Sequence, residues 1–220
     1  SLIVQDVNYY KVDDLHVHRL VSRYHNSNTF IAHSFGSAEV IIVDPGDPDT
    51  SLIVEYLNAK EFDIHSVWLT HEHSDHCAGI NALYTRQAFP IYCTAICAQN
   101  VLNPKRNFSA YIDEIETFIV HPATTAVGHK CGVNFGGKEI IVLSTPGHTK
   151  GSACFILGST VFSGDTLMKD YKTPLNFPGS DKVAYQNSIR TLLQNLKSDS
   201  YIFPGHGNPF ALSEYSLSGG

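Results

Sequence analysis

The chain has 220 residues, 43% of them hydrophobic, and a formal net charge of −6. That length and composition suit one folded domain with its own core, which we expect to run from residue 1 to residue 220. The acidic balance lacks the basic surface that phosphate binding requires, which disfavours a nucleic-acid partner. No apolar run approaches the roughly 18 residues of a membrane span, and the N-terminal stretch lacks the layout of a signal peptide, so we expect no membrane association.

The cysteines indicate a reducing compartment. They form an odd set of five, scattered through the chain, which is not typical of a disulfide framework. We therefore expect a cytoplasmic protein in which the cysteines serve as small buried apolar side chains: Cys77, Cys93, Cys97, Cys131 and Cys154.

Short apolar, β-branched runs alternate with helical patterns, which predicts an α/β layered fold. Helical patterns occupy residues 50–60, 80–86 and 184–197. The first of them follows two candidate caps, Asp49 and Thr50. Strand-like runs occupy residues 40–46, 66–70, 90–94, 139–145, 153–158, 160–165 and 200–207.

Two parts of the chain echo each other. The runs EVIIVDPG (39–46) and TVFSGD (160–165) each end a strand on Asp and Gly, and each precedes a helical pattern and a strand that ends on His. We interpret them as two related halves that bring side chains from strand ends to one seam. The least regular segment, Val101 to Gly128, is expected either to lie over the site or to form a surface excursion.

The stretch VWLTHEHSDHCAG carries the densest group of ionisable side chains, directly after a predicted strand. Strand ends are where α/β folds usually place their sites. In an extended segment, side chains two apart point the same way, so His71 and His73 are expected to converge on one ion while Asp75 and His76 face another. Glu72, which alternates with these residues, is expected to be a peripheral spacer.

Three more candidates lie in tight turns after strands. His148 and His206 follow Pro-Gly turns, and Asp165 ends an apolar strand. A carboxylate such as Asp165 can bridge two cations because each of its oxygens can serve one of them. The other histidines are expected to lie outside the site: His16, His18, His25, His33, His65, His121 and His129.

The ordered motifs THEHSDH, TPGHTKGS, FSGDTL and PGHG resemble the metallo-β-lactamase-fold superfamily, and within it the glyoxalase II branch, from about Thr29 to Phe210. The resemblance implies an αββα sandwich of two similar halves with metals at one edge of the sheets. It also implies an assignment by position: one metal on His71, His73 and His148, a second on Asp75, His76 and His206, Asp165 as the bridge, and Asp44 supporting the site from behind.

The chemistry implied is that of a binuclear metal-dependent hydrolase. Two divalent ions, with zinc expected and iron or manganese also compatible with these ligands, would lower the pKa of a shared water and polarise a carbonyl. Metal-bound hydroxide would then attack a thioester or ester such as an S-acylglutathione. Asp75 is expected to be catalytic, since it would orient the hydroxide and help transfer a proton to the leaving group.

The chain departs from the glyoxalase II pattern in two places. It stops soon after PGHGNPF, so it is similar to short relatives without the helical C-terminal region that contacts glutathione. Those relatives commonly carry a Gly-Arg pair where this chain has Thr173 and Pro174. Lys169, Tyr171 and Lys172 are candidates for its anion-binding role, with a solvated loop as the alternative.

Other activities of the same fold stay open at this point. An iron-dependent persulfide dioxygenase would use a mononuclear site that matches His71, His148 and Asp165. A lactonase, a β-lactamase-like enzyme, a nuclease and a non-enzymatic metal-held scaffold are further alternatives. The sequence leaves open the small-molecule substrate, the metal, the oligomeric state, and the role of Cys77.

Overall fold

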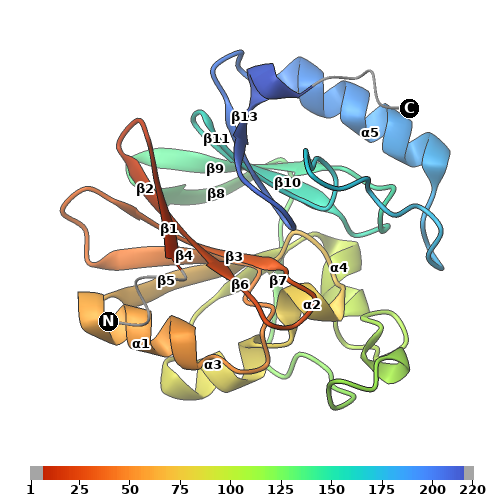
Figure 1. Ribbon diagram of the computed structural model, residues 1–220, viewed down its shortest axis with the longest axis horizontal. Coiled ribbons are helices and arrows are strands. Elements are labelled where there is room, and N and C mark those ends of the chain that lie inside the picture. Colours follow the sequence, from red (N-terminus) through yellow and green to blue (C-terminus); the bar gives the residue numbers. More distant parts are fainter. Residues whose placement is uncertain (1–6, 216–220) are drawn as a thin grey trace.

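Two β-sheets stack face to face, and helices cover their outer surfaces (Figure 1). This computed structural model describes residues 7–215. The predicted αββα sandwich is confirmed. Residues 1–6 and 216–220, the two ends of the expected single domain, lie outside the described residues, as does the start of the N-terminal stretch examined for a signal peptide.

The first sheet has seven strands in chain order. Its first four strands pair antiparallel and its last four pair parallel, because β4, β5, β6 and β7 are joined by crossovers. The strands are β1 (Val7–Val12), β2 (Leu15–Val21), β3 (Asn28–Ser34), β4 (Glu39–Val43), β5 (Asp63–Trp68), β6 (Ile91–Cys93) and β7 (Thr125–Ala126).

The second sheet has six strands in the order β13-β12-β11-β10-β9-β8. Only the β11–β12 pair is parallel. The strands are β8 (Lys130–Phe135), β9 (Lys138–Ser144), β10 (Ala153–Leu157), β11 (Thr160–Gly164), β12 (Tyr201–Pro204) and β13 (Phe210–Ala211).

Helices α1 and α3 lie on the outer face of the first sheet and α5 lies on the outer face of the second (Figure 1). Between residues 7 and 215 there are five α-helices: α1 (Ser51–Lys60), α2 (Ser74–Cys77), α3 (Ile80–Arg86), α4 (Ala95–Asn100) and α5 (Lys182–Asn195). The three predicted helices are confirmed. Thr50 occupies the cap position of α1 without a side-chain capping bond, while the Asp49 carboxylate accepts a hydrogen bond from the Ser51 amide.

The core lies in three layers. Aromatic side chains such as Phe30, Trp68 and Phe155 fill the space between the sheets. Separate apolar clusters join the first sheet to its helices and the second sheet to α5. Four of the cysteines are buried as predicted and Cys131 is half-buried, and all five carry free thiols.

The predicted echo is visible as two parallel strand–helix–strand units, β4-α1-β5 and β11-α5-β12. The carboxyl ends of these strands meet at one edge of the sandwich, which is where parallel units place their loops. Within residues 7–215, no helix has the length and apolar character needed to cross a membrane.

Candidate metal centre and substrate cavity

The predicted site residues lie in loops after the carboxyl ends of β5, β9, β11 and β12. The loop after β5 delivers His71 and His73 and then turns into the short helix α2, which carries Asp75 and His76. Glycine allows the loop after β12 to approach: a Cβ at Gly205 would lie 2.1 Å from an Asp165 carboxylate oxygen. A larger residue at position 205 would therefore displace that carboxylate.

Two groups of donor atoms face each other in this edge. Within each group the donor atoms lie within 4.8 Å of one another. The groups are His71, His73 and His148, and Asp75, His76 and His206.

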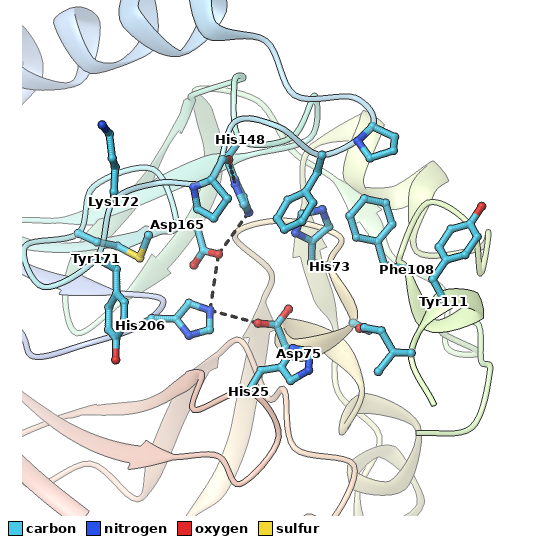
Figure 2. Close-up of a pocket in the computed structure, with 16 residues that line it drawn as sticks. His25, His73, Asp75, Phe108, Tyr111, His148, Asp165, Tyr171, Lys172 and His206 are labelled. Atoms are coloured by element: carbon cyan, nitrogen blue, oxygen red, sulfur yellow. Dashed lines mark hydrogen bonds and ion pairs between the residues drawn. The ribbon is translucent and has the colours of Figure 1, made fainter. Parts of the chain in front are cut away.

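Asp165 lies between the two groups. One of its carboxylate oxygens is 3.2 Å from Nε2 of His148, and the other is 3.4 Å from Nε2 of His76. Figure 2 shows this carboxylate between His148 and His206, with His206 also 3.1 Å from Asp75. The oxygen near His148 also lies 3.6 Å from Nε2 of His206, so a single carboxylate faces both groups, as a bridging ligand must.

Three of the candidate ligand histidines, His71, His76 and His148, keep Nε2 free of a hydrogen bond. The Nδ1 atom of His148 lies 2.8 Å from the Pro174 carbonyl, which can only accept, so Nδ1 carries the hydrogen. The Nδ1 atom of His76 lies 2.9 Å from the Asp44 carboxylate. The Nε2 atoms of His71, His76 and His148 are buried without a hydrogen-bond partner, as is one oxygen of Asp165. Buried polar atoms are rarely left unpaired, and these unpaired atoms are all potential metal donors.

Asp44 holds the site from behind. Its carboxylate accepts hydrogen bonds from the Thr70 amide at 2.8 Å, from the Thr70 hydroxyl at 2.6 Å and from His76. Since the Thr70 hydroxyl donates to Asp44, its oxygen accepts from Nδ1 of His71 at 3.0 Å. Although Asp44 lies close to His71 and His76, both of its oxygens are already engaged. It therefore fits the task of fixing ring orientation.

The electrostatics of the site favour a cation. Burial lowers the pKa of His73 to about 3 and that of His71 well below its usual value, which keeps both rings neutral. Burial opposes ionisation of Asp75 and Asp165, but His76 and His206 pull the pKa of each carboxyl well below its ordinary range. The two carboxylates in turn raise the pKa of His76 well above its usual value despite burial. The two neutral imidazoles of His71 and His73, together with the buried carboxylates, are donors that divalent metal ions accept.

Glu72 differs from the expectation of a peripheral spacer, because the structure buries it. Its side chain is 3% exposed and accepts hydrogen bonds from the Asn100 amide and the Thr149 hydroxyl. Thr149 follows His148, so Glu72 ties the loop after β5 to the loop after β9. The prediction failed because alternation along the chain says which way a side chain points, and not what packs against it from another loop.

Two of the three candidates for anion binding lie at the cavity, and the third, Lys169, does not. Tyr171 and Lys172 line the cavity beside the donor groups, and the Tyr171 ring lies 6.3 Å from that of His206 (Figure 2). Lys169 does not line this cavity, and its ammonium instead pairs with Glu214 at 2.6 Å. Thr173 and Pro174, which stand where relatives carry a Gly-Arg pair, contact the site through hydrogen bonds. The Thr173 hydroxyl donates to the Asp165 carbonyl, and the Pro174 carbonyl accepts from His148.

A cavity of about 660 Å³ opens over the donor groups. Its wall includes residues that the sequence did not place at the site: His25, Phe108, Tyr111, Ile112, Phe177 and Pro178. Three of them come from the segment Val101 to Gly128, so this segment lies partly over the site. His25 was expected to lie away from the site, but it lines the cavity and is 3.6 Å from Glu114. A turn histidine gives no sign in the sequence of which loop it will face.

The thiol of Cys77 is buried outside the candidate site. The residue is 1% exposed, and burial raises its pKa well above the usual value. The sulfur lies within hydrogen-bonding distance of the carbonyls of Glu72 and His73. A neutral buried thiol, as expected from the sequence, is the form that this environment stabilises.

Comparison with known protein families identifies the superfamily of the chain. The family model described as the metallo-beta-lactamase superfamily matches residues 23–206, so the chain belongs to that superfamily. The resemblance inferred from the four motifs is thereby confirmed, and this fold implies divalent metal ions, which the His and Asp groups of the site suit.

Relatives of known sequence include enzymes named hydroxyacylglutathione hydrolase. One, from Shewanella baltica, is 26% identical over 200 residues, covering 90% of this chain and 68% of its own length. The matches to three further Shewanella baltica proteins of that name each span 65% of the relative, just under two thirds. A probable metallo-hydrolase from Streptococcus pyogenes is 28% identical over 87% of this chain and 83% of its own length.

Solved structures share the fold. The B3 metallo-beta-lactamase BLEG-1 superposes with a TM-score of 0.80 at 22% identity, covering 89% of this chain and 93% of its own. TTHA1623 in a di-iron-bound form gives a TM-score of 0.72 at 24% identity, covering 86% and 91%. ETHE1 from Myxococcus xanthus gives 0.69 at 19% identity, covering 90% and 80%. At these identities the likeness concerns the fold alone.

Proposed function

We propose that this chain is a binuclear metal-dependent hydrolase of thioesters or related esters, similar to hydroxyacylglutathione hydrolases (glyoxalase II). The observation that carries the proposal is the Asp165 carboxylate, which lies between two groups of donors, where Nε2 of His71, His76 and His148 is buried without a hydrogen-bond partner. A structural metal site is normally closed by four ligands around one ion, whereas seven convergent donors suit two ions.

We assign the candidate ligands to two ions by their positions. His71, His73 and His148 would hold one and Asp75, His76 and His206 the other, with Asp165 shared. Two divalent ions held by these residues would lower the pKa of a bound water and polarise the substrate carbonyl. We expect zinc, although the same imidazole and carboxylate donors accept iron or manganese.

The chain's own contribution to the reaction centres on Asp75. Its side chain is 14% exposed and lines the cavity, whereas that of Asp165 is only 7% exposed. Asp75 can therefore accept a proton from the attacking water and pass it to the departing thiolate or alkoxide. Asp44 and Thr70 fix the Nδ1 side of His76 and of His71, so these two rings need not reorient as charge develops.

S-Acylglutathiones are the proposed substrate class. The relatives named hydroxyacylglutathione hydrolase support this. Tyr171 and Lys172 line the same cavity, but Figure 2 shows the Lys172 ammonium directed away from the donor groups. Free thiols on all five cysteines support a cytoplasmic setting, where glutathione is abundant. We further propose that residues 1–220 act as one domain.

Metal analysis of protein purified without added metal, coupled to a glutathione-thioester hydrolysis assay, tests the proposal. About two equivalents of metal per chain with turnover is the expected result. One equivalent of iron, with oxygen uptake on glutathione persulfide and no thioester hydrolysis, would replace it with the dioxygenase alternative.

A further inference from the structure

One wall of the cavity is aromatic and packs directly on a candidate metal ligand. The Phe108 ring stacks on the His73 imidazole at a centroid distance of 4.5 Å and an interplanar angle of 25°. Phe177 meets His73 edge-on at 5.8 Å and Phe108 at 5.6 Å. Figure 2 shows Phe108 and Tyr111 on the His73 side of the cavity, opposite Tyr171 and Lys172.

Phe108 is held in a backbone conformation that a bulky residue rarely adopts. Its φ angle is +69°, in the left-handed region, where an L-residue with a large side chain is strained. Such strain persists only where the surroundings enforce it, and it concentrates at functional sites. The conformation turns the ring over His73.

Asn107 holds Phe108 in this backbone conformation through its own hydrogen bonds. It is fully buried, its carbonyl accepts from the Ser74 amide at 2.7 Å, and its side chain bonds to the Phe118 carbonyl and the Ser109 amide. Ser74 begins the helix that carries Asp75, so one residue connects the position of Phe108 to the candidate metal centre.

The aromatic wall offers no hydrogen bonds to a substrate group that rests on it. The Ser74 hydroxyl, which also lines the cavity, is already bonded to the Tyr24 hydroxyl at 2.7 Å. The Tyr111 hydroxyl points away from the donor groups (Figure 2). A hydroxyl placed against Phe108 and Phe177 would lose its bonds to water without replacement, whereas a methyl or phenyl group would gain apolar contact.

We infer that the Phe108–Phe177 wall binds an apolar acyl group, aliphatic or aromatic, next to the carbonyl that is hydrolysed. The preferred substrates are therefore thioesters of unsubstituted acids and not of hydroxy acids. This inference rests on the proposed hydrolase function and narrows it. It assigns acyl selectivity to Phe108, with Asn107 as the positioning residue.

A matched pair of substrates tests the inference. Isobutyryl-glutathione and lactoyl-glutathione differ by a methyl group in place of a hydroxyl, and we expect kcat/KM to favour the isobutyryl thioester about 10- to 100-fold. Phe108→Gly removes the ring while glycine keeps the left-handed backbone, so the loop retains its course. We expect this variant to reduce the preference about tenfold or more. Phe35→Ala, at a remote ring that is 84% exposed, should leave it unchanged.

A binding measurement tests the apolar subsite independently of the proposed hydrolase function. Calorimetric titration of the metal-loaded protein should show phenylacetate binding at least about tenfold more tightly than acetate, with the difference lost in Phe108→Gly. If no thioester is hydrolysed but this binding pattern holds, the hydrolase proposal fails and the apolar subsite stands. Equal binding of the two acids, or a wild-type preference for the lactoyl thioester, would overturn the subsite.

Discussion

Two clusters of histidines in this molecule differ in what their ring nitrogens face. At the candidate metal centre, the free Nε2 atoms of His71, His76 and His148 converge on carboxylates. On β2 and β3, His18 and His33 face each other, with 3.3 Å between their Nε2 atoms.

The second cluster pairs several of its ring nitrogens internally, although Nε2 of His16 is buried without a hydrogen-bond partner. Nδ1 of His33 donates to the Ser34 carbonyl, so a neutral His33 ring accepts at Nε2 from His18. His16 stacks on His33 at 4.9 Å, and its Nδ1 pairs with the Tyr9 hydroxyl. No acidic side chain is grouped with these rings among the described residues. Histidine density alone therefore does not make a metal site; free nitrogens aimed at carboxylates on strand-end loops do.

Replacing Asp165 should have the largest effect, because it removes the group that faces both donor sets. We expect Asp165→Ala to lower hydrolysis by more than about 100-fold, since even outer partners of metal ligands are worth about 10- to 100-fold. Metal content should fall in parallel, as measured by elemental analysis. Asp63→Ala, at an exposed position on β5, is the control. Activity that survives in Asp165→Ala would show that the bridging assignment is wrong.

Asp44→Asn tests the support behind the rings. The substitution weakens the acceptor for Thr70 and His76, and we expect metal affinity to fall about 10- to 100-fold in a chelator competition assay. Asp13→Asn is a matched control, because Asp13 is exposed and shares a positive φ angle, 51° against 54° for Asp44. Equal effects of the two changes would mean that the backbone, and not the carboxylate, is responsible.

Glu72→Gln tests whether the buried Glu72 carboxylate, in the loop after β5, stabilises the fold. Replacing one acceptor oxygen by an amide leaves Asn100 or Thr149 without its partner, which should lower the free energy of unfolding by about 1–3 kcal/mol in urea denaturation. Glu55→Gln, on the exposed side of α1, should change little. If Glu72→Gln instead retains full stability but loses metal, Glu72 belongs to the ligand set.

The smallest effect is expected at the other histidine cluster. Burial, with His33 and Lys60 nearby, lowers the pKa of His18 to about 4. The unfolded chain therefore binds a proton that the folded chain does not, so stability is fully present above about pH 6.5 and falls as the pH drops toward 4. In urea denaturation of metal-free protein at pH 7.5 and 4.5, His18→Gln should reduce the difference relative to wild type, whereas the exposed-site variant His121→Gln should not. An unchanged difference in His18→Gln would contradict the lowered pKa.

Local sequence signals account for the parts of the fold that were predicted. The parallel units β4-α1-β5 and β11-α5-β12 are encoded by apolar runs, by helical periodicity and by turn residues at their strand ends. The seven candidate ligands lie after the carboxyl ends of β5, β9, β11 and β12, so strand position predicted that they gather at one edge, and the resemblance supplied their division between two ions. The ligand roles themselves stay a prediction.

The substrate wall could not be predicted in this way. Phe108 owes its position to a left-handed backbone that Asn107 enforces through contacts with Ser74 and Phe118, neither of which has a recognisable local pattern. Glu72 was missed for the same reason, since its partners come from α4 and from the loop after β9. Contacts between loops depend on the whole fold, and periodicity does not report them.

Zinc titration of the metal-free protein, followed by calorimetry, tests the two-ion centre most directly. The wild-type chain should bind two equivalents, and Asp165→Ala should bind at most one with comparable affinity, because both donor sets lose their shared oxygen ligand. Binding of a single equivalent by the wild type, or of two undiminished equivalents by Asp165→Ala, would contradict a centre in which Asp165 joins two metal ions.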